Sequence, residues 1–186
     1  MNNGRITTPM SVYLKFLKPS SIKDREVIWV EGRNGGKLVA HETGLKNLIR
    51  FNLDPTGFVA MRGQKYPITD IGLENLLTKV IETGERDRKF GECEVRFFDN
   101  AKVGDNVCTM MQVIHPVKQP HFDFFVARVY FDNELNVPIR YASWSWPAEE
   151  GSQPVLEEEY TYTNLELNVG LTDSDFDPDN PQYNYP

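Results

Sequence analysis

Short strand-like runs dominate the second half of this sequence and most constrain its fold. Runs rich in β-branched and aromatic residues follow one another with only short polar connections between them. Strands joined by short loops are usually antiparallel neighbours in one sheet. The sequence therefore predicts an antiparallel meander with strands at residues 93–98, 106–115, 122–132, 137–146 and 155–168.

The first half of the chain carries further strand patterns. Residues 11–17 alternate between apolar and polar side chains, which predicts a strand. The runs 26–30 and 37–41 flank the turn residues 34–36 and are expected to form a β-hairpin. Residues 48–51 fit either a short strand or a helical turn.

One helix is expected at about residues 70–83, where apolar residues recur at helical spacing. Gly84 is placed to end this helix. The fold class that follows is mainly β (α+β). The 186 residues show no internal repeat or interdomain linker, which predicts a single domain over 1–186. Residues 172–186 are acidic and rich in Pro and Asn, so they are expected to form an extended surface tail.

Charge and hydropathy exclude several classes of function. The net charge is −7 and no basic stripe occurs, which argues against nucleic-acid binding. No apolar run approaches the ~20 residues that a transmembrane helix needs. Residues 1–5 are polar and show no signal-peptide pattern.

Two predicted strands carry apolar side chains on both faces. Residues 122–132 and 137–146 place aromatic or aliphatic residues at odd and even positions alike. A sheet with two apolar faces needs two coverings, which the helix and either the far wall of a curved sheet or a bound ligand would supply. Alternatively, these rings are simply core residues. Strand position selects six candidates for the wall of a ligand site: Phe16, Trp29, Phe125, Tyr141, Trp144 and Tyr160.

No catalytic, metal or cofactor motif stands out. His41, His115 and His121 lack a third ligand at a spacing that zinc would need. The alternating aspartates from Asp173 lack the Gly and the acid that a calcium loop requires. Residues 157–159 are acidic, and we expect Glu158 to form a structural ion pair. The chain is therefore predicted to bind no metal or cofactor and not to be an enzyme.

Cys93 and Cys108 are a candidate disulfide. If the turn between their strands is centred between Asn100 and Ala101, the two cysteines lie directly opposite each other. A bulge in the loop would break this register. The bond is expected only if the protein is exported, because the cytoplasm keeps thiols reduced.

Several motifs together resemble a known family. They resemble an uncharacterised, DUF-type family of exported bacterial proteins, which in turn is similar to the periplasmic lipoprotein-carrier (LolA-type) proteins. The motifs occupy residues 13–19, 25–27, 36–41, 67–72, 138–141, 158–162 and 167–176.

The resemblance implies a fold and a location. The fold is an incomplete antiparallel β-barrel, in which a helix covers the concave face of a strongly curved sheet and acyl chains bind between them. The location is periplasmic or exported. Family members carry a helix and first strands before the motif at Tyr13, so this chain is expected to lack them. The strand at 11–17 would then be an exposed edge open to self-association.

Two functions are consistent with these observations. The first is a non-enzymatic binding module that holds a lipid, a lipoprotein acyl chain or another apolar ligand. The alternative is a structural or protein-interaction domain with the same fold and no ligand cavity.

Overall fold

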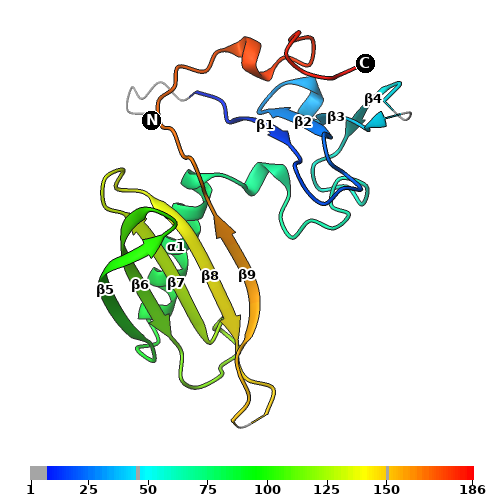
Figure 1. Ribbon diagram of the computed structural model, residues 1–186. Coiled ribbons are helices and arrows are strands. Elements are labelled where there is room, and N and C mark those ends of the chain that lie inside the picture. The colour runs from blue at the N-terminus through cyan, green and yellow to red at the C-terminus, as the bar shows by residue number, and fades with distance from the viewer. Residues whose placement is uncertain (1–7, 45–46, 150) are drawn as a thin grey trace, which may run out of the picture. The chain divides into compact units, whose positions relative to one another are not determined.

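A computed structural model describes residues 8–44, 47–149 and 151–186 (Figure 1). The chain is mainly β, with two antiparallel sheets and one α-helix in these residues. The elements are β1 (Ser11–Lys15), β2 (Glu26–Val30), β3 (Leu38–His41), β4 (Arg50–Leu53), α1 (Leu73–Arg88), β5 (Glu94–Val103), β6 (Asn106–Ile114), β7 (Val126–Asp132), β8 (Pro138–Ser145) and β9 (Val155–Thr161).

The chain divides into two compact units. The first contains the described residues up to Ile71 together with Leu167–Pro186, and the second contains Gly72–Glu166. Two compact units can belong to one folding domain, so the expectation of a single domain stays a prediction.

The first sheet has the strand order β1-β2-β3-β4. Its β2 and β3 are antiparallel neighbours, which confirms the predicted hairpin. The segment left open between strand and helical turn forms a strand, Arg50–Leu53. Because β1 pairs only with β2 within the sheet, the predicted edge position of this strand is confirmed.

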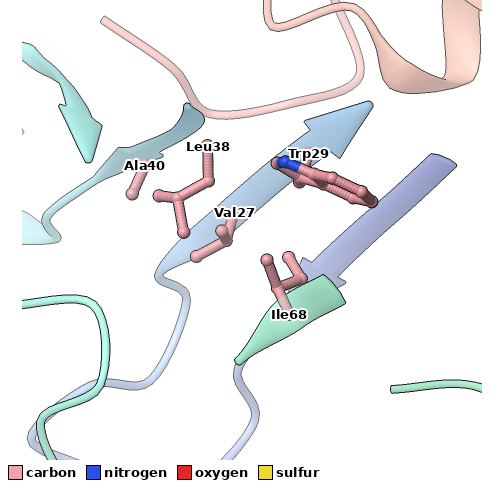
Figure 2. Packing of buried hydrophobic residues seen from close by; sticks show 5 residues of the cluster. All are labelled: Val27, Trp29, Leu38, Ala40 and Ile68. Atoms are coloured by element: carbon pink, nitrogen blue, oxygen red, sulfur yellow. The ribbon is translucent and has the colours of Figure 1, made fainter. Parts of the chain in front are cut away.

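One face of the first sheet carries a compact apolar core. Val27, Trp29, Leu38 and Ala40 alternate toward the same side of β2 and β3, and Ile68 packs against them from a 3-10 turn (Figure 2). The Trp29 indole N–H donates to the Gly36 carbonyl at 3.1 Å, so its polar atom is satisfied. All five residues of β2 are buried, which means that the opposite face of this strand is covered as well.

The second sheet has the order β5-β6-β7-β8-β9, which confirms the predicted meander. Its first hairpin differs from the prediction. Val103 pairs with Asn106, so the turn lies at Gly104 and Asp105, and Gly104 takes the positive φ of 59° that the turn requires. Asn100, which suggested the turn, instead lies in a β-bulge between Phe98 and Ala101.

The shifted turn overturns the expected pairing of the cysteines. Cys108 lies opposite Ala101, eight residues further along the chain than Cys93, which precedes β5 at its other end. Both cysteines are free thiols in the structure. The predicted disulfide is therefore wrong, because it depended on a turn centred between Asn100 and Ala101.

The helix extends further than the sequence indicates. α1 spans Leu73–Arg88, so Gly84 lies inside it and does not end it. Figure 1 shows α1 lying against one face of the second sheet. Within the residues described, the strands form two open sheets, and the single half-barrel implied by the family resemblance is not confirmed. No helix in this part of the chain is long and apolar enough to cross a bilayer.

The buried core predicts which substitutions destabilise the first unit. Replacing Trp29, which is 9% exposed, with alanine is expected to lower the free energy of unfolding by about 3–5 kcal/mol. Replacing Phe58, which is 86% exposed, with alanine should change it by less than about 0.5 kcal/mol. Urea denaturation measures both values, and equal effects would contradict this assignment of the core.

Candidate binding site

Two of the six predicted wall residues belong to the core of the first unit. Trp29 is part of the buried cluster, and Phe16 is half-buried and packs against it. Trp29 is therefore enclosed by protein, whereas Phe16 is partly exposed.

The other four wall residues lie in the second unit. Tyr141 of β8 is directly opposite Tyr160 of β9, so these two rings share one face of the sheet. Trp144 lies three positions further along β8 and projects from the opposite face. Phe125 precedes β7, and its backbone N–H donates to the Trp144 carbonyl at 2.8 Å. The six residues therefore do not form one wall.

The face that carries Tyr141 and Tyr160 is also the face that α1 covers. His115 continues the alternation of Met111 and Val113 along β6, and its ring contacts Asp87 of α1. We call this side of the sheet the helix face. Cross-strand partners assign the following residues to it: Val95, Phe97, Met111, Val113, Ala127, Val129, Tyr141, Ser143 and Tyr160.

Burial on the helix face is uneven. Ala127 and Val129 at the centre are 4% and 3% exposed, whereas Val95 and Phe97 on β5 are 49% and 66% exposed. On the helix itself, Ile81 is 57% exposed. The helix face is thus sealed along its middle and open, with apolar side chains, at the β5 edge.

The opposite face of the sheet is covered by its own arginines, and we call it the arginine face. Arg128 lies over the Trp144 ring with 5.0 Å between the guanidinium carbon and the ring centroid. Arg140 lies over Tyr130 in the same way at 5.5 Å and forms an ion pair with Glu159 at 2.7 Å. Stacked guanidinium groups keep their charge in water while they shield the rings. The guanidinium groups of Arg128 and Arg140 thus cover the Trp144 and Tyr130 rings on this face.

A buried polar cluster joins α1 to the end of β6. The His115 ring is fully buried, and its Nδ1 donates to the Phe124 carbonyl at 3.0 Å. Its Nε2 faces Asp87 Oδ2 at 3.3 Å, an electrostatic contact without good hydrogen-bond alignment. Arg86 donates to both Asp87 and Asp123 at 2.9 Å. Both ring nitrogens of His115 therefore face protein oxygens inside the fold.

A small open pocket of about 360 Å³ lies beside this cluster. Two of its lining residues are acidic, and none of the six predicted wall residues contributes to it. No group of three metal-binding side chains gathers anywhere in the residues described. The pocket is lined by Gly91, Glu92, Cys93, Glu94, Pro116, Val117 and Gln119.

A second buried polar network lies in the first unit. Glu26 is 1% exposed and accepts hydrogen bonds from Tyr13 Oη at 2.8 Å and from the Asn184 backbone N–H at 2.7 Å. His41 Nε2 is 2.9 Å from Glu26 Oε2, and His41 Nδ1 is 2.6 Å from the Glu42 carbonyl. As with His115, both ring nitrogens of His41 are engaged.

The network shifts the acidity of its members. Burial alone would raise the pKa of the Glu26 carboxyl, but hydrogen bonds from Asn184, Tyr13 and His41 outweigh it and hold that pKa below its ordinary value. Burial and the nearby carboxylate raise the pKa of Tyr13. Local sequence patterns do not reveal this site, because a glutamate at the start of a strand is usually exposed.

A family model decides where this chain belongs. The model described as "Protein of unknown function (DUF1571)" matches residues 3–185. The chain belongs to the DUF1571 family. Among curated proteins, none matches the sequence.

Two solved structures are similar to this DUF1571 chain at low sequence identity. One is the complex of the CwlD amidase from Clostridioides difficile with the GerS lipoprotein, at 14% identity and a TM-score of 0.39, covering 84% of this chain and 69% of that one. The other is a DUF1329 family protein from Desulfovibrio piger, at 11% identity and a TM-score of 0.31, covering 89% and 74%. Likeness at this level assigns no function.

The Glu26 network predicts a dependence of stability on pH. A pKa lowered by folding stabilises the protein above the ordinary glutamate value of 4.5, and this stabilisation is lost as the pH falls through the lowered pKa. Glu26→Gln is therefore expected to lower the free energy of unfolding at pH 7, on the order of 3 kcal/mol, because it leaves His41 without its charged partner. The difference between wild type and variant should shrink in acid.

Urea denaturation between pH 7 and pH 3 measures this difference. Glu94→Gln is a matched control, because Glu94 is 51% exposed and forms an ion pair with Arg96, which is 61% exposed. The control should lie within about 0.5 kcal/mol of wild type at pH 7. A gap between wild type and Glu26→Gln that stays constant down to pH 3 would contradict the assigned shift of the Glu26 pKa.

Proposed function

We propose that this DUF1571 protein is a non-enzymatic binding module that holds an apolar ligand at the β5 edge of the helix face. The observation that carries the proposal is the exposure of Phe97, 66%, on the same sheet face whose centre is fully buried. Val95, two residues before it on the same face, is 49% exposed. A monomer rarely leaves such apolar side chains together in water without a use.

The chemistry of this edge favours a hydrocarbon chain. Its named side chains are aliphatic or aromatic, and they offer van der Waals contact without a fixed pattern of hydrogen bonds. An acyl chain gains about 0.8 kcal/mol for each CH₂ group that leaves water. We therefore propose an acyl chain of a lipid or lipoprotein as the ligand, held between the concave side of a curved sheet and α1.

The polar clusters support a binding role over catalysis. His41 and His115 are 1% and 0% exposed, and their ring nitrogens face protein atoms. Neither ring is accessible to a substrate in this arrangement. An exported or periplasmic location is part of the same proposal and rests on the family resemblance of the sequence.

A polar substitution at the open edge tests the proposal. Phe97→Ser is expected to weaken binding of a fluorescent fatty acid to the purified protein by at least about fivefold, because it removes the most exposed ring of the edge. Phe58→Ser is the matched control, since Phe58 is 86% exposed but lies in the first unit. Fluorescence titration measures both, and circular dichroism confirms that each variant is folded.

Two results would contradict the proposal. One is an absence of saturable fatty-acid binding to the wild type. The other is equal binding by the wild type and Phe97→Ser.

A protein-interaction domain is the second candidate, favoured by the edge position of β1. This strand has a neighbour on one side only, so its outer backbone groups can pair with a strand from another chain. A stable dimer in light scattering, with no bound lipid, would favour this function over a carrier.

A further inference from the structure

The C-terminal residues 172–186, which we call the strap, cover the face of the first sheet that lies opposite its core. Contrary to the prediction from sequence, the strap is not extended throughout, because Asp173–Phe176 form a 3-10 helix, and it makes specific contacts with the sheet. Its last four residues meet the four strands in order. Tyr183 stacks on Tyr13 of β1 at 4.2 Å, Asn184 bonds to Glu26 of β2, Tyr185 donates to the Val39 carbonyl of β3 at 3.0 Å, and Pro186 accepts from Arg50 of β4 at 3.0 Å.

Side chains of the first unit bind the main chain of the strap. Glu26 accepts from the Asn184 N–H, and Asn47 Nδ2 donates to the Asn184 carbonyl at 2.8 Å. Arg50 Nε donates to the Pro186 carbonyl. Contacts to the main chain, with two rings in fixed places, are the way in which proteins recognise extended peptides.

Charge adds a second element of recognition. The strap contains Asp173 and Asp179, which pair with Arg33 at 2.8 Å and with Arg50 at 2.7 Å. Both aspartates are largely exposed, so these pairs steer an acidic segment more than they stabilise it.

The strap is separable from the core of the unit. Val27 and Trp29 pack on the other face of the sheet, and the strap does not contribute to their cluster. The residues that lead to the strap form no helix or strand after Thr161, and Val169 and Leu171 are 52% and 64% exposed. Release of the strap would therefore leave the apolar core in place.

We propose that this face of the first sheet is a peptide-binding surface, which the chain's own strap occupies and which an acidic, extended partner segment with two tyrosines spaced two residues apart can take instead. The partner would use the same three groups: Glu26 for a backbone N–H, Arg50 for a carbonyl, and the Tyr13 ring for stacking. This surface is separate from the apolar edge of the second sheet, so the inference does not depend on the proposed ligand.

Because the strap is covalently attached to the sheet, the concentration of free peptide decides whether it can replace the strap. A segment on a short flexible linker acts at an effective concentration on the order of millimolar. A free peptide must exceed this concentration to displace the wild-type strap. Weakening the strap itself, without changing the sheet, should allow the peptide to bind at a much lower concentration.

The test uses the full chain and a labelled peptide of residues 172–186. In the variant Tyr183→Ser/Tyr185→Ser, the strap loses both rings while the sheet residues stay intact. Fluorescence anisotropy is expected to show saturable binding of the peptide to this variant, at least tenfold tighter than to the wild type. A peptide with the same two substitutions should bind at least tenfold more weakly.

Two further variants locate the binding surface. Adding Arg50→Met to the double variant should weaken peptide binding about fivefold or more, whereas adding Arg96→Met, an exposed arginine in the second unit, should not change it. Circular dichroism confirms folding of each variant. No saturable binding up to several millimolar, or equal binding of the substituted peptide, would overturn the proposal.

NMR of the wild type provides a measurement without any substitution. In isotope-labelled protein, a few millimolar of unlabelled peptide should move the ring signals of the strap's own Tyr183 and Tyr185 toward those of the free peptide, because the strap leaves the sheet. Unchanged signals at this concentration would also overturn the proposal.

Discussion

A single helix is too narrow to cover a five-stranded sheet, and this difference in width determines which residues of the helix face are buried in the second unit. The outer strands of such a sheet are about 19 Å apart at the usual spacing of ~4.8 Å, whereas a helix with its side chains is about 10–12 Å across. α1 therefore seals Ala127 and Val129 at the centre and leaves Phe97 in water at the edge. On the arginine face, Arg128 and Arg140 cover the rings of Trp144 and Tyr130.

In the first unit, the strap covers one face of the sheet in place of an α-helix. Its sheet has a core on one face and the strap on the other, and β2 is buried on both sides as a result. An extended strap presents backbone groups that must be paired, and Glu26 and Arg50 pair with them. Burial of the Glu26 carboxylate is tolerable because several donors converge on it.

Local patterns predicted the order of the strands well, because short connections leave few alternatives to an antiparallel meander. These predictions failed where one backbone conformation is compatible with two kinds of structure. Asn100 has a positive φ, which fits a turn and a bulge equally, and the bulge moved the hairpin and separated the cysteines. Gly84 was read as a helix end, but the good helix formers after it carry α1 to Arg88. Contacts between distant segments, such as Tyr183 on Tyr13, leave no local pattern.

Native mass spectrometry of the purified chain, followed by organic extraction and lipid analysis, tests the central claim most directly. If the open edge around Phe97 is a ligand surface, part of the protein should carry an additional mass, and the extract should contain a lipid or fatty acid that accounts for it. A chain that shows only its own mass, and that acquires none when a fatty acid is added before the measurement, would contradict the claim.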